Sequence, residues 1–295
     1  MASRSPAIAS AESAAPRAAA VPLAALAVSL VSQNLGAAIA KGLFPVVGVE
    51  GMTALRIGLS ALLLLLFWRP WRTPVARRDV GNIVIYGAML GGMNLCIYHA
   101  FARIPIGIAT AIETTGPLVV VLAASRRALD VAWVALALAG LALLLPLAAD
   151  RAFDPLGLLF AFGAAASWAL YIVFGKRVSM LASGQAVSLG MLVAALFAVP
   201  IGIAHAGAEM RVPTTLVAGL GVALLSSAVP YSLEMAALRR MPRQVFGILV
   251  SATPAVGAAC GALVLGEHLG GQQWLAIACI VAASAGGAAT GRARA

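Results

Sequence analysis

The sequence predicts an all-α integral membrane protein, with ten transmembrane helices arranged as two inverted five-helix repeats and both termini in the cytoplasm. Three observations support this prediction: the composition, a series of long apolar segments, and motifs that recur in the two halves of the chain. Of the 295 residues, 62% are hydrophobic and only 10% are charged, whereas soluble domains average about 45–50% apolar and about 25% charged residues. No soluble core could bury this much apolar surface, so the solvent of the chain must be a lipid bilayer.

Apolar segments of spanning length follow one another with short connections. A spanning helix needs about 20 mainly apolar residues, and helices are favoured here because the alternating pattern of a membrane β-barrel is absent. The predicted spans are residues 21–40, 52–68, 81–102, 106–124, 131–148, 155–175, 185–204, 214–238, 244–265 and 272–290. Residues 1–20 are rich in Ala, Ser and Pro, and we expect them to form a disordered cytoplasmic tail.

Lys and Arg are distributed unequally between the two predicted sides of the membrane. The tails and the even-numbered loops hold 15 of them, the odd-numbered loops hold 4, and Arg56 lies within the second span, which together make all 20. Because cytoplasmic loops are enriched in Lys and Arg, this excess places both termini in the cytoplasm. A net charge of +10 can also indicate nucleic-acid binding, but membrane orientation explains these residues, and we expect no nucleic-acid partner.

Two motifs recur at a nearly constant offset. The segment "RIPIGIATAIETTGP" (103–117) resembles "RMPRQVFGILVSATP" (240–254), 137 residues later, and "SQNLGAAIAK" (32–41) resembles "SWALYIVFGK" (167–176), 135 residues later. The repeats are therefore predicted at 21–148 and 155–290, with five helices each. Because five is an odd number, the second repeat enters the membrane from the opposite side, which is the inverted architecture of many secondary transporters.

Four charged side chains lie within or close to the spans: Lys41, Arg56, Glu113 and Glu234. A charge at the centre of a membrane helix costs about 2.5–3.5 kcal/mol on insertion scales, so such residues usually face an aqueous cavity or a partner. Glu113, in "ATAIETTGPLVV" (109–120), is the most central. Burial favours the protonated form of a carboxyl group and a substrate ammonium favours the ionised form, so one group could exchange a proton for an amine. The alternative is that the two acids and two bases only neutralise one another.

Three prolines and a set of polar side chains add to the predicted site. Pro117 and Pro254 occupy matching places in the two halves, and Pro230 precedes Glu234. Each removes a helical hydrogen bond, and helices broken at corresponding positions of two repeats point to a central site, although ordinary membrane helices also tolerate Pro. Side chains that could line the cavity, or only bond neighbouring helices, are Gln33, Asn34, Asn94, Tyr98, Trp168, Tyr171 and Tyr231.

Signatures of enzymes and metal sites are absent from the sequence. It contains no G-x-S-x-G, no H-E-x-x-H and no P-loop, so we predict no catalytic residues and no enzyme. The three cysteines lie in apolar runs without a C-x-x-C motif, which argues against a disulfide or a metal site. The alternatives to a transporter are a membrane enzyme or receptor, and a channel.

Five motifs resemble the threonine/homoserine exporter family, in the EamA branch of the drug/metabolite transporter superfamily. They are "AKGLFPVVG" (40–48), "GGMNL" (91–95), "ASRRALD" (124–130), "VPYSLEM" (229–235) and "LGE" (265–267), and the resemblance extends from about residue 22 to 290. It implies a multi-pass protein of the bacterial inner membrane that exports threonine, homoserine and similar amino acids with the proton gradient. It also implies that Glu113 and Glu234 match the family's acids in the fourth and eighth spans, and that Arg56 and Lys41 match its basic positions.

One position departs from the family's pattern. Relatives commonly carry Glu-Pro where this chain has Thr253-Pro254. If that Glu helps to couple protons, the coupling here must depend on Glu113 or Glu234, or work differently.

We therefore predict a secondary active transporter that exports small hydrophilic amino acids by proton antiport with alternating access. The proton-motive force would drive it, with no cofactor, and its partners would be the substrate and the lipid bilayer, with the oligomeric state left open. The alternative is an exporter of cationic or aromatic drugs or metabolites, in which Tyr98, Trp168 and Tyr231 would form an aromatic cage.

Overall fold

The computed structural model describes residues 6–123, 128–144, 154–178, 181, 183–238, 240 and 243–290, and within these ranges every regular element is a helix. The helices are α1 (Pro6–Trp68), α2 (Arg77–Phe101), α3 (Ile106–Ala123), α4 (Ala128–Leu144), α5 (Pro155–Val178), α6 (Ser183–Ala206), α7 (Pro213–Ala223), α8 (Val229–Leu238), α9 (Arg243–Val250), α10 (Thr253–Leu265) and α11 (Gly271–Thr290). Short turns of 3₁₀ helix, η1 (Pro70–Arg72) and η3 (Glu209–Arg211), and a π-helical turn, η4 (Leu224–Ala228), complete the described elements.

The apolar helices coincide with the predicted spans. Seven helical stretches among the described residues are long and apolar enough to cross a membrane, and the longest, Val21–Trp68, has 48 residues. At about 1.5 Å per residue it would extend about 70 Å, more than twice the hydrocarbon thickness of about 30 Å. Gly48 divides it into two legs with a φ of 73°, a backbone conformation that Gly adopts most readily. The two legs therefore occupy the places of the first and second predicted spans.

Two shorter apolar helices, Ile106–Val120 and Val131–Leu144, occupy the places of the fourth and fifth predicted spans. The end of the fifth, 145–148, lies outside the described residues. The described part of the chain is thus consistent with the predicted order of spans. The number of membrane crossings and the cytoplasmic location of the termini stay predictions.

The N-terminal segment differs from the expectation of a disordered tail. Helix α1 begins at Pro6, and only residues 1–5 of the predicted tail lie outside the described residues. The segment from Pro6 to Ala20 is rich in Ala, the residue with the highest helix propensity, which accounts for its helical conformation.

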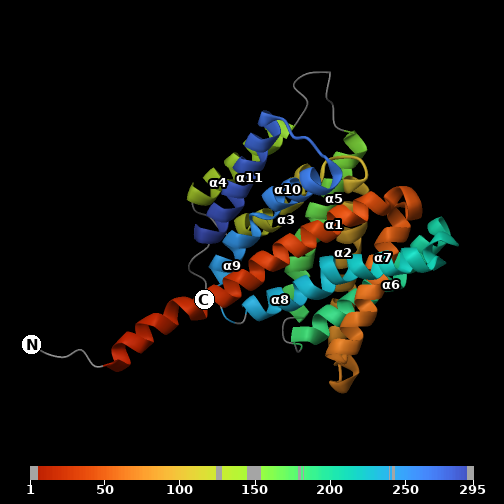
Figure 1. The fold of residues 1–295 in the computed structure, drawn as a ribbon, viewed down its shortest axis with the longest axis horizontal. Coiled ribbons are helices and arrows are strands. Elements are labelled where there is room, and N and C mark those ends of the chain that lie inside the picture. Colours follow the sequence, from red (N-terminus) through yellow and green to blue (C-terminus); the bar gives the residue numbers. More distant parts are fainter. Residues whose placement is uncertain are drawn as a thin grey trace, which may run out of the picture.

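The helices of the two halves pack against one another in pairs. The second leg of α1 packs on α6, α3 on α10 and α4 on α11, and Figure 1 shows α4 and α11 side by side. Helix α2 packs on α5 and α6. In the predicted repeat, the second leg of α1 is equivalent to α6, α3 to α10, and α4 to α11. The packing of these pairs agrees with the repeat. The repeat itself stays a prediction.

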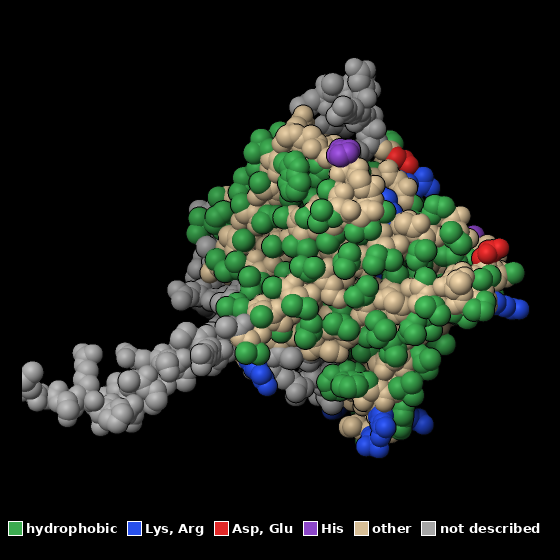
Figure 2. Space-filling view, viewed as in Figure 1, with side chains coloured by type: hydrophobic (Ala, Val, Ile, Leu, Met, Phe, Trp, Pro, Cys, Tyr) green, Lys and Arg blue, Asp and Glu red, His purple; other side chains and the backbone are tan. Residues whose placement is uncertain are grey.

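Hydrophobic side chains cover the outer surface of the helices. In Figure 2 they extend across the face in view, and the Lys, Arg, Asp and Glu side chains lie mainly at its margins. Large apolar residues such as Leu196, Val217 and Leu263 are 68%, 71% and 86% exposed. Such an exposed apolar surface is typical of helices that face lipid, in agreement with the composition.

The crossing of α3 and α5 depends on a glycine. A Cβ atom on Gly116 would overlap the backbone carbonyl of Ala165, which cannot rotate away. We expect Gly116→Ala to destabilise the protein by about 1–3 kcal/mol, the usual cost of overpacking, measured as a lower midpoint of thermal unfolding in detergent. Gly81→Ala is the matched control, since a Cβ there meets no atom within 4 Å. Equal unfolding midpoints for the two variants would contradict this prediction.

Candidate functional site

A cavity of about 330 Å³ lies among helices of both halves of the chain. Its lining residues come from both legs of α1 and from α2, α3, α5, α8, α9 and α10. Nine of the side chains predicted from the sequence line it. These nine are Gln33, Asn34, Arg56, Asn94, Glu113, Trp168, Tyr171, Tyr231 and Glu234. The fold therefore brings together polar groups that are up to about 200 positions apart in the sequence.

Both predicted acids face this cavity. Glu113 projects from the middle of α3 and Glu234 from α8, and both are half-buried. Glu234 accepts a hydrogen bond from Ser29 (3.0 Å from Oγ to Oε1). The ion pairs formed by the described residues do not include Glu113. Its carboxyl group is thus not joined to a cation within 4.0 Å, although Arg56 of the same cavity interacts with it electrostatically.

Arg56, on the second leg of α1, is the cationic group of the cavity, and only 6% of it is exposed. Its Nε donates to Ser227 Oγ (3.3 Å) and its Nη2 donates to the Ser226 carbonyl (3.2 Å). The guanidinium also lies 5.0 Å from the centre of the Tyr98 ring, over its face. These partners hold the guanidinium in place, and none of them is charged.

The two serines lie on η4, the π-helical turn that precedes α8. Pro230 has no N–H, so it cannot bond to the carbonyl of Ser226, four residues earlier, or that of Leu225, five residues earlier. Arg56 donates to the Ser226 carbonyl, and Ser32 Oγ donates to the Leu225 carbonyl (2.7 Å). The sequence prediction missed these three serines, although a Ser-Ser pair just before a membrane Pro was a usable signal.

The other two predicted helix breaks differ from one another. Pro254 is in the first turn of α10, after an interruption at Ser251 and Ala252 that separates α10 from α9. Thr253 Oγ1 donates to the Val250 carbonyl (2.6 Å), which is the carbonyl that Pro254 leaves without an α-helical donor. Helix α3, in contrast, continues through Pro117. Any role of these prolines in gating stays a prediction.

The amide side chains offer mainly acceptors to a ligand. Asn34 Nδ2 donates to the Leu30 carbonyl (2.8 Å), and Asn94 Nδ2 donates to the Leu90 carbonyl (2.7 Å). Each amide nitrogen thus bonds to its own helix, and each side-chain oxygen is left as the stronger group for a ligand.

An aromatic set of residues completes the lining. Trp168 and Tyr171 from α5 and Tyr231 from α8 line the cavity. Tyr171 accepts a hydrogen bond from Tyr86 (2.9 Å between the hydroxyl oxygens), and the two rings stack.

Tyr98 does not line the cavity, contrary to the sequence prediction. It is fully buried, with its ring 5.5 Å from that of Phe44 and with Arg56 over its face. Its position on α2 directs it into the core beneath the guanidinium, so it supports Arg56 instead of facing the cavity. Its hydroxyl group has no hydrogen-bond partner among the described residues.

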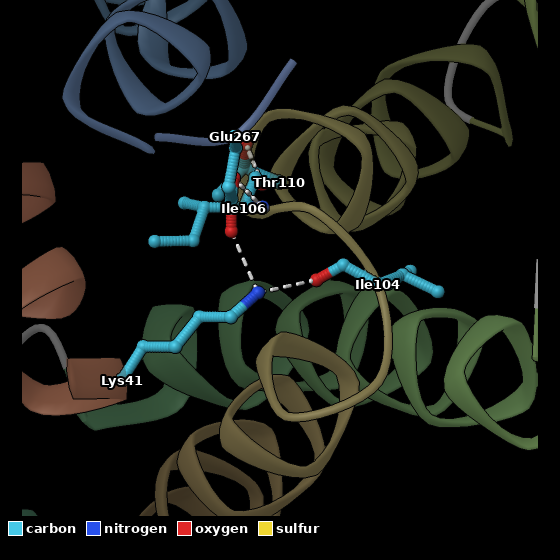
Figure 3. Close-up of polar contacts among 5 residues, drawn as sticks. All are labelled: Lys41, Ile104, Ile106, Thr110 and Glu267. Carbon is cyan, nitrogen blue, oxygen red and sulfur yellow. Dashed lines mark hydrogen bonds and ion pairs between the residues drawn. The ribbon is translucent and has the colours of Figure 1, made fainter. Parts of the chain in front are cut away.

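Lys41 is also absent from the cavity lining, so the structure does not bring it together with the other predicted site residues. Its Nζ lies 2.6 Å from Glu267 Oε1 and donates to the Ile104 carbonyl (3.0 Å). Glu267 Oε2 accepts from the backbone N–H of Ile106 (2.9 Å), in the first turn of α3. Figure 3 shows Lys41 and Glu267 pointing toward one another, with the Ile104 carbonyl beside the Lys41 nitrogen. A carboxylate is favoured at the N-terminus of a helix, so Glu267 of the "LGE" motif stabilises both α3 and Lys41.

The Lys41–Glu267 pair should contribute to stability. Removing one partner of a fully buried ion pair costs about 3–5 kcal/mol because the other charge is left unpaired. These side chains are 21% and 11% exposed, so we expect a smaller loss for Lys41→Met or Glu267→Gln alone. The double variant should recover part of the loss. The measurement is a double-mutant cycle on thermal unfolding in detergent, and strictly additive effects would show that the two groups are not coupled.

Comparisons with known proteins agree with this arrangement. The EamA-like transporter family matches residues 155–286. The threonine/homoserine exporter RhtA of Salmonella typhimurium (strain LT2) is 45% identical over 271 residues, and that of Escherichia coli (strain K12) is 45% identical over 273, each covering 92% of both chains.

A solved crystal structure of a protein 20% identical to this chain superposes with a TM-score of 0.56, over 89% of this chain and 96% of the other, and it supports the fold alone. The long apolar helices and these bacterial relatives identify a multi-pass protein of the bacterial inner membrane, as predicted. With 45% identity across nearly its whole length, the chain belongs to the threonine/homoserine exporter family of EamA-like transporters.

Proposed function

We propose that this protein is a secondary active transporter that exports threonine, homoserine and similar small hydrophilic amino acids from the cytoplasm. The observation that carries the proposal is one cavity in which Arg56 and two carboxyl groups, Glu113 and Glu234, meet. An amino acid presents a carboxylate and an ammonium, so it needs both kinds of partner. The volume of about 330 Å³ lies at the lower end of the range of ligand pockets, about 300–1,000 Å³, which suits a small metabolite. The relatives named threonine/homoserine exporters support the same class of substrate.

In the proposed complex, Arg56 binds the substrate carboxylate and Glu113 binds the ammonium. A guanidinium matches a carboxylate through two parallel hydrogen bonds, and two of its five N–H groups are already anchored to Ser226 and Ser227. The acceptor oxygens of Asn34 and Asn94 are suited to the hydroxyl group of threonine or homoserine.

Proton antiport follows from the same carboxyl group. When no substrate is bound, the low-polarity surroundings favour protonated Glu113, and an arriving ammonium favours the ionised form. Substrate and proton would then occupy Glu113 in turn, while the cavity opens alternately to the two sides. Thr253 places a hydroxyl on the Val250 carbonyl, and among the residues that line the cavity Glu113 and Glu234 are the acids available for coupling.

A second candidate function is export of a cationic or aromatic compound. Trp168, Tyr171 and Tyr231 line the cavity, and aromatic faces attract organic cations. The cage predicted from the sequence loses Tyr98, which is buried beneath Arg56, and this weakens the alternative.

Uptake of labelled threonine into inside-out vesicles tests the proposal, because export then appears as uptake. We expect saturable uptake that unlabelled homoserine inhibits and that a quaternary ammonium compound does not. The reverse order of inhibition would favour the second candidate. Accelerated exchange of labelled threonine in vesicles preloaded with unlabelled threonine would exclude a channel, whereas passive conductance would favour one.

A further inference from the structure

The cation of the cavity is held by groups that carry no charge. Arg56 is 6% exposed, and the ion pairs among the described residues do not include it. Its partners are a carbonyl, a hydroxyl and an aromatic face, which come from Ser226, Ser227 and Tyr98. A buried charge is usually matched by an opposite charge. Glu113 lines the same cavity and acts on Arg56 electrostatically, but not as an ion pair within 4.0 Å. Two of the five N–H groups of Arg56 are in use, so the others are available for an anionic ligand.

The segment that holds Arg56 is itself fixed on several sides. Pro230 has no N–H to donate to the Leu225 and Ser226 carbonyls, and Ser32 Oγ donates to the Leu225 carbonyl (2.7 Å). Ser60 Oγ reaches the Ala223 carbonyl (3.5 Å). Gly36 on α1 lies against Ser226, where even a Cβ atom would come within 3.0 Å. The π-helical turn is thus a rigid support, as a site that must hold a side chain in one orientation requires.

On this basis we propose that Ser227 is a positioning residue that makes the cavity select ligands with a free carboxylate. Its hydroxyl oxygen accepts from Nε, and the Ser226 carbonyl accepts from Nη2. Together with the Tyr98 ring face, these bonds fix the plane of the guanidinium and direct its other N–H groups to the cavity. A carboxylate gains most from a guanidinium whose fork is already oriented. The inference rests on the proposed function, since it concerns how the same cavity recognises an amino acid.

The test compares threonine with 1-amino-2-propanol, which is threonine without its carboxyl group. Both are measured in inside-out vesicles, threonine by uptake and the amine by its inhibition of that uptake. In Ser227→Ala the guanidinium is no longer oriented before the carboxylate arrives, so the KM for threonine should rise about tenfold. The maximal rate and the inhibition constant of the amine should stay as in the unaltered protein. Ser227→Thr, which keeps the hydroxyl, should restore the KM.

A matched control separates positioning from a general loss of structure. Ser232 on α8 is exposed, and its hydroxyl donates to the carbonyl of Ala228, the last residue of η4. Since Ser232 is not among the cavity-lining residues and Arg56 does not bond to it, Ser232→Ala should leave both constants unchanged. If Ser227→Ala does not fold, Ser227→Cys keeps a side chain of the same shape and slightly larger size with only a weak acceptor, and it should show the same rise in KM.

The outcomes distinguish this inference from the proposed function. Suppose that the unaltered protein transports threonine. If Ser227→Ala changes neither the KM for threonine nor the inhibition constant of the amine, or raises both equally, the positioning role is wrong and the proposed function stands. If the unaltered protein does not transport threonine, both are wrong. If it transports threonine but binds the amine equally well, the cavity does not select a carboxylate, so the inference is wrong while threonine export stands.

Discussion

Replacing Glu113 with Gln should reduce threonine export to the background of vesicles without the protein, while the protein still folds. Gln has nearly the same shape and can hydrogen bond, but it neither binds a proton reversibly nor attracts an ammonium by charge. Glu113 lines the cavity outside the ion pairs of the described residues, so its loss should leave no cation unpaired and the fold intact. The measurement is the initial rate of labelled threonine uptake into inside-out vesicles, normalised to protein abundance.

Glu209→Gln is the control for this prediction. Glu209 is an exposed residue of η3, away from the cavity, and its substitution should leave transport unchanged. Threonine transport at the normal rate in the Glu113→Gln variant would remove Glu113 from the mechanism, whatever the control showed.

Replacing Arg56 with Lys should raise the KM for threonine by about thirtyfold or more. Truncating one partner of a buried, hydrogen-bonded charge pair costs about 2–5 kcal/mol. Lys keeps the charge but has a single ammonium, which cannot bond to Ser226 and Ser227 and also present a fork to the substrate. Binding of 1-amino-2-propanol should change far less, since this amine has no carboxylate.

Arg103→Lys is the matched control, because Arg103 forms an exposed ion pair with Asp154 (3.0 Å) and such pairs contribute little. It should leave the KM for threonine unchanged. An Arg56→Lys variant with a normal KM would mean that another group binds the carboxylate.

The sequence predicted the helices and the charged core of the cavity because both follow from the cost of burying polar groups in lipid. Long apolar segments must be helical, and Glu113 and Arg56 are conspicuous because a charge within such a segment is expensive. The amides at 34 and 94 and the aromatic residues Trp168 and Tyr231 were found for the same reason.

Other assignments depended on contacts that a sequence does not reveal. Lys41 was assigned to the cavity because it is a charged residue close to a span. Its partner Glu267 is 226 residues away in the sequence, so the pairing could not be seen there. Tyr98 is on the helix that carries Asn94, yet its side chain is directed into the core, and hydropathy cannot give this direction. The serines of the π-helical turn were missed because Ser is common in membrane helices. The only sign in the sequence that the helix changes to π-type hydrogen bonds here is a Ser-Ser pair shortly before Pro230.

Proton exchange at Glu113 can be measured directly in liposomes that contain the purified protein and enclose a pH-sensitive dye. When threonine is added outside, its entry should be accompanied by exit of protons, so the lumen should become more alkaline with the unaltered protein and should not change with Glu113→Gln. If threonine enters while the luminal pH stays constant, or if the Glu113→Gln protein still moves protons with threonine, then Glu113 does not exchange a proton for the substrate.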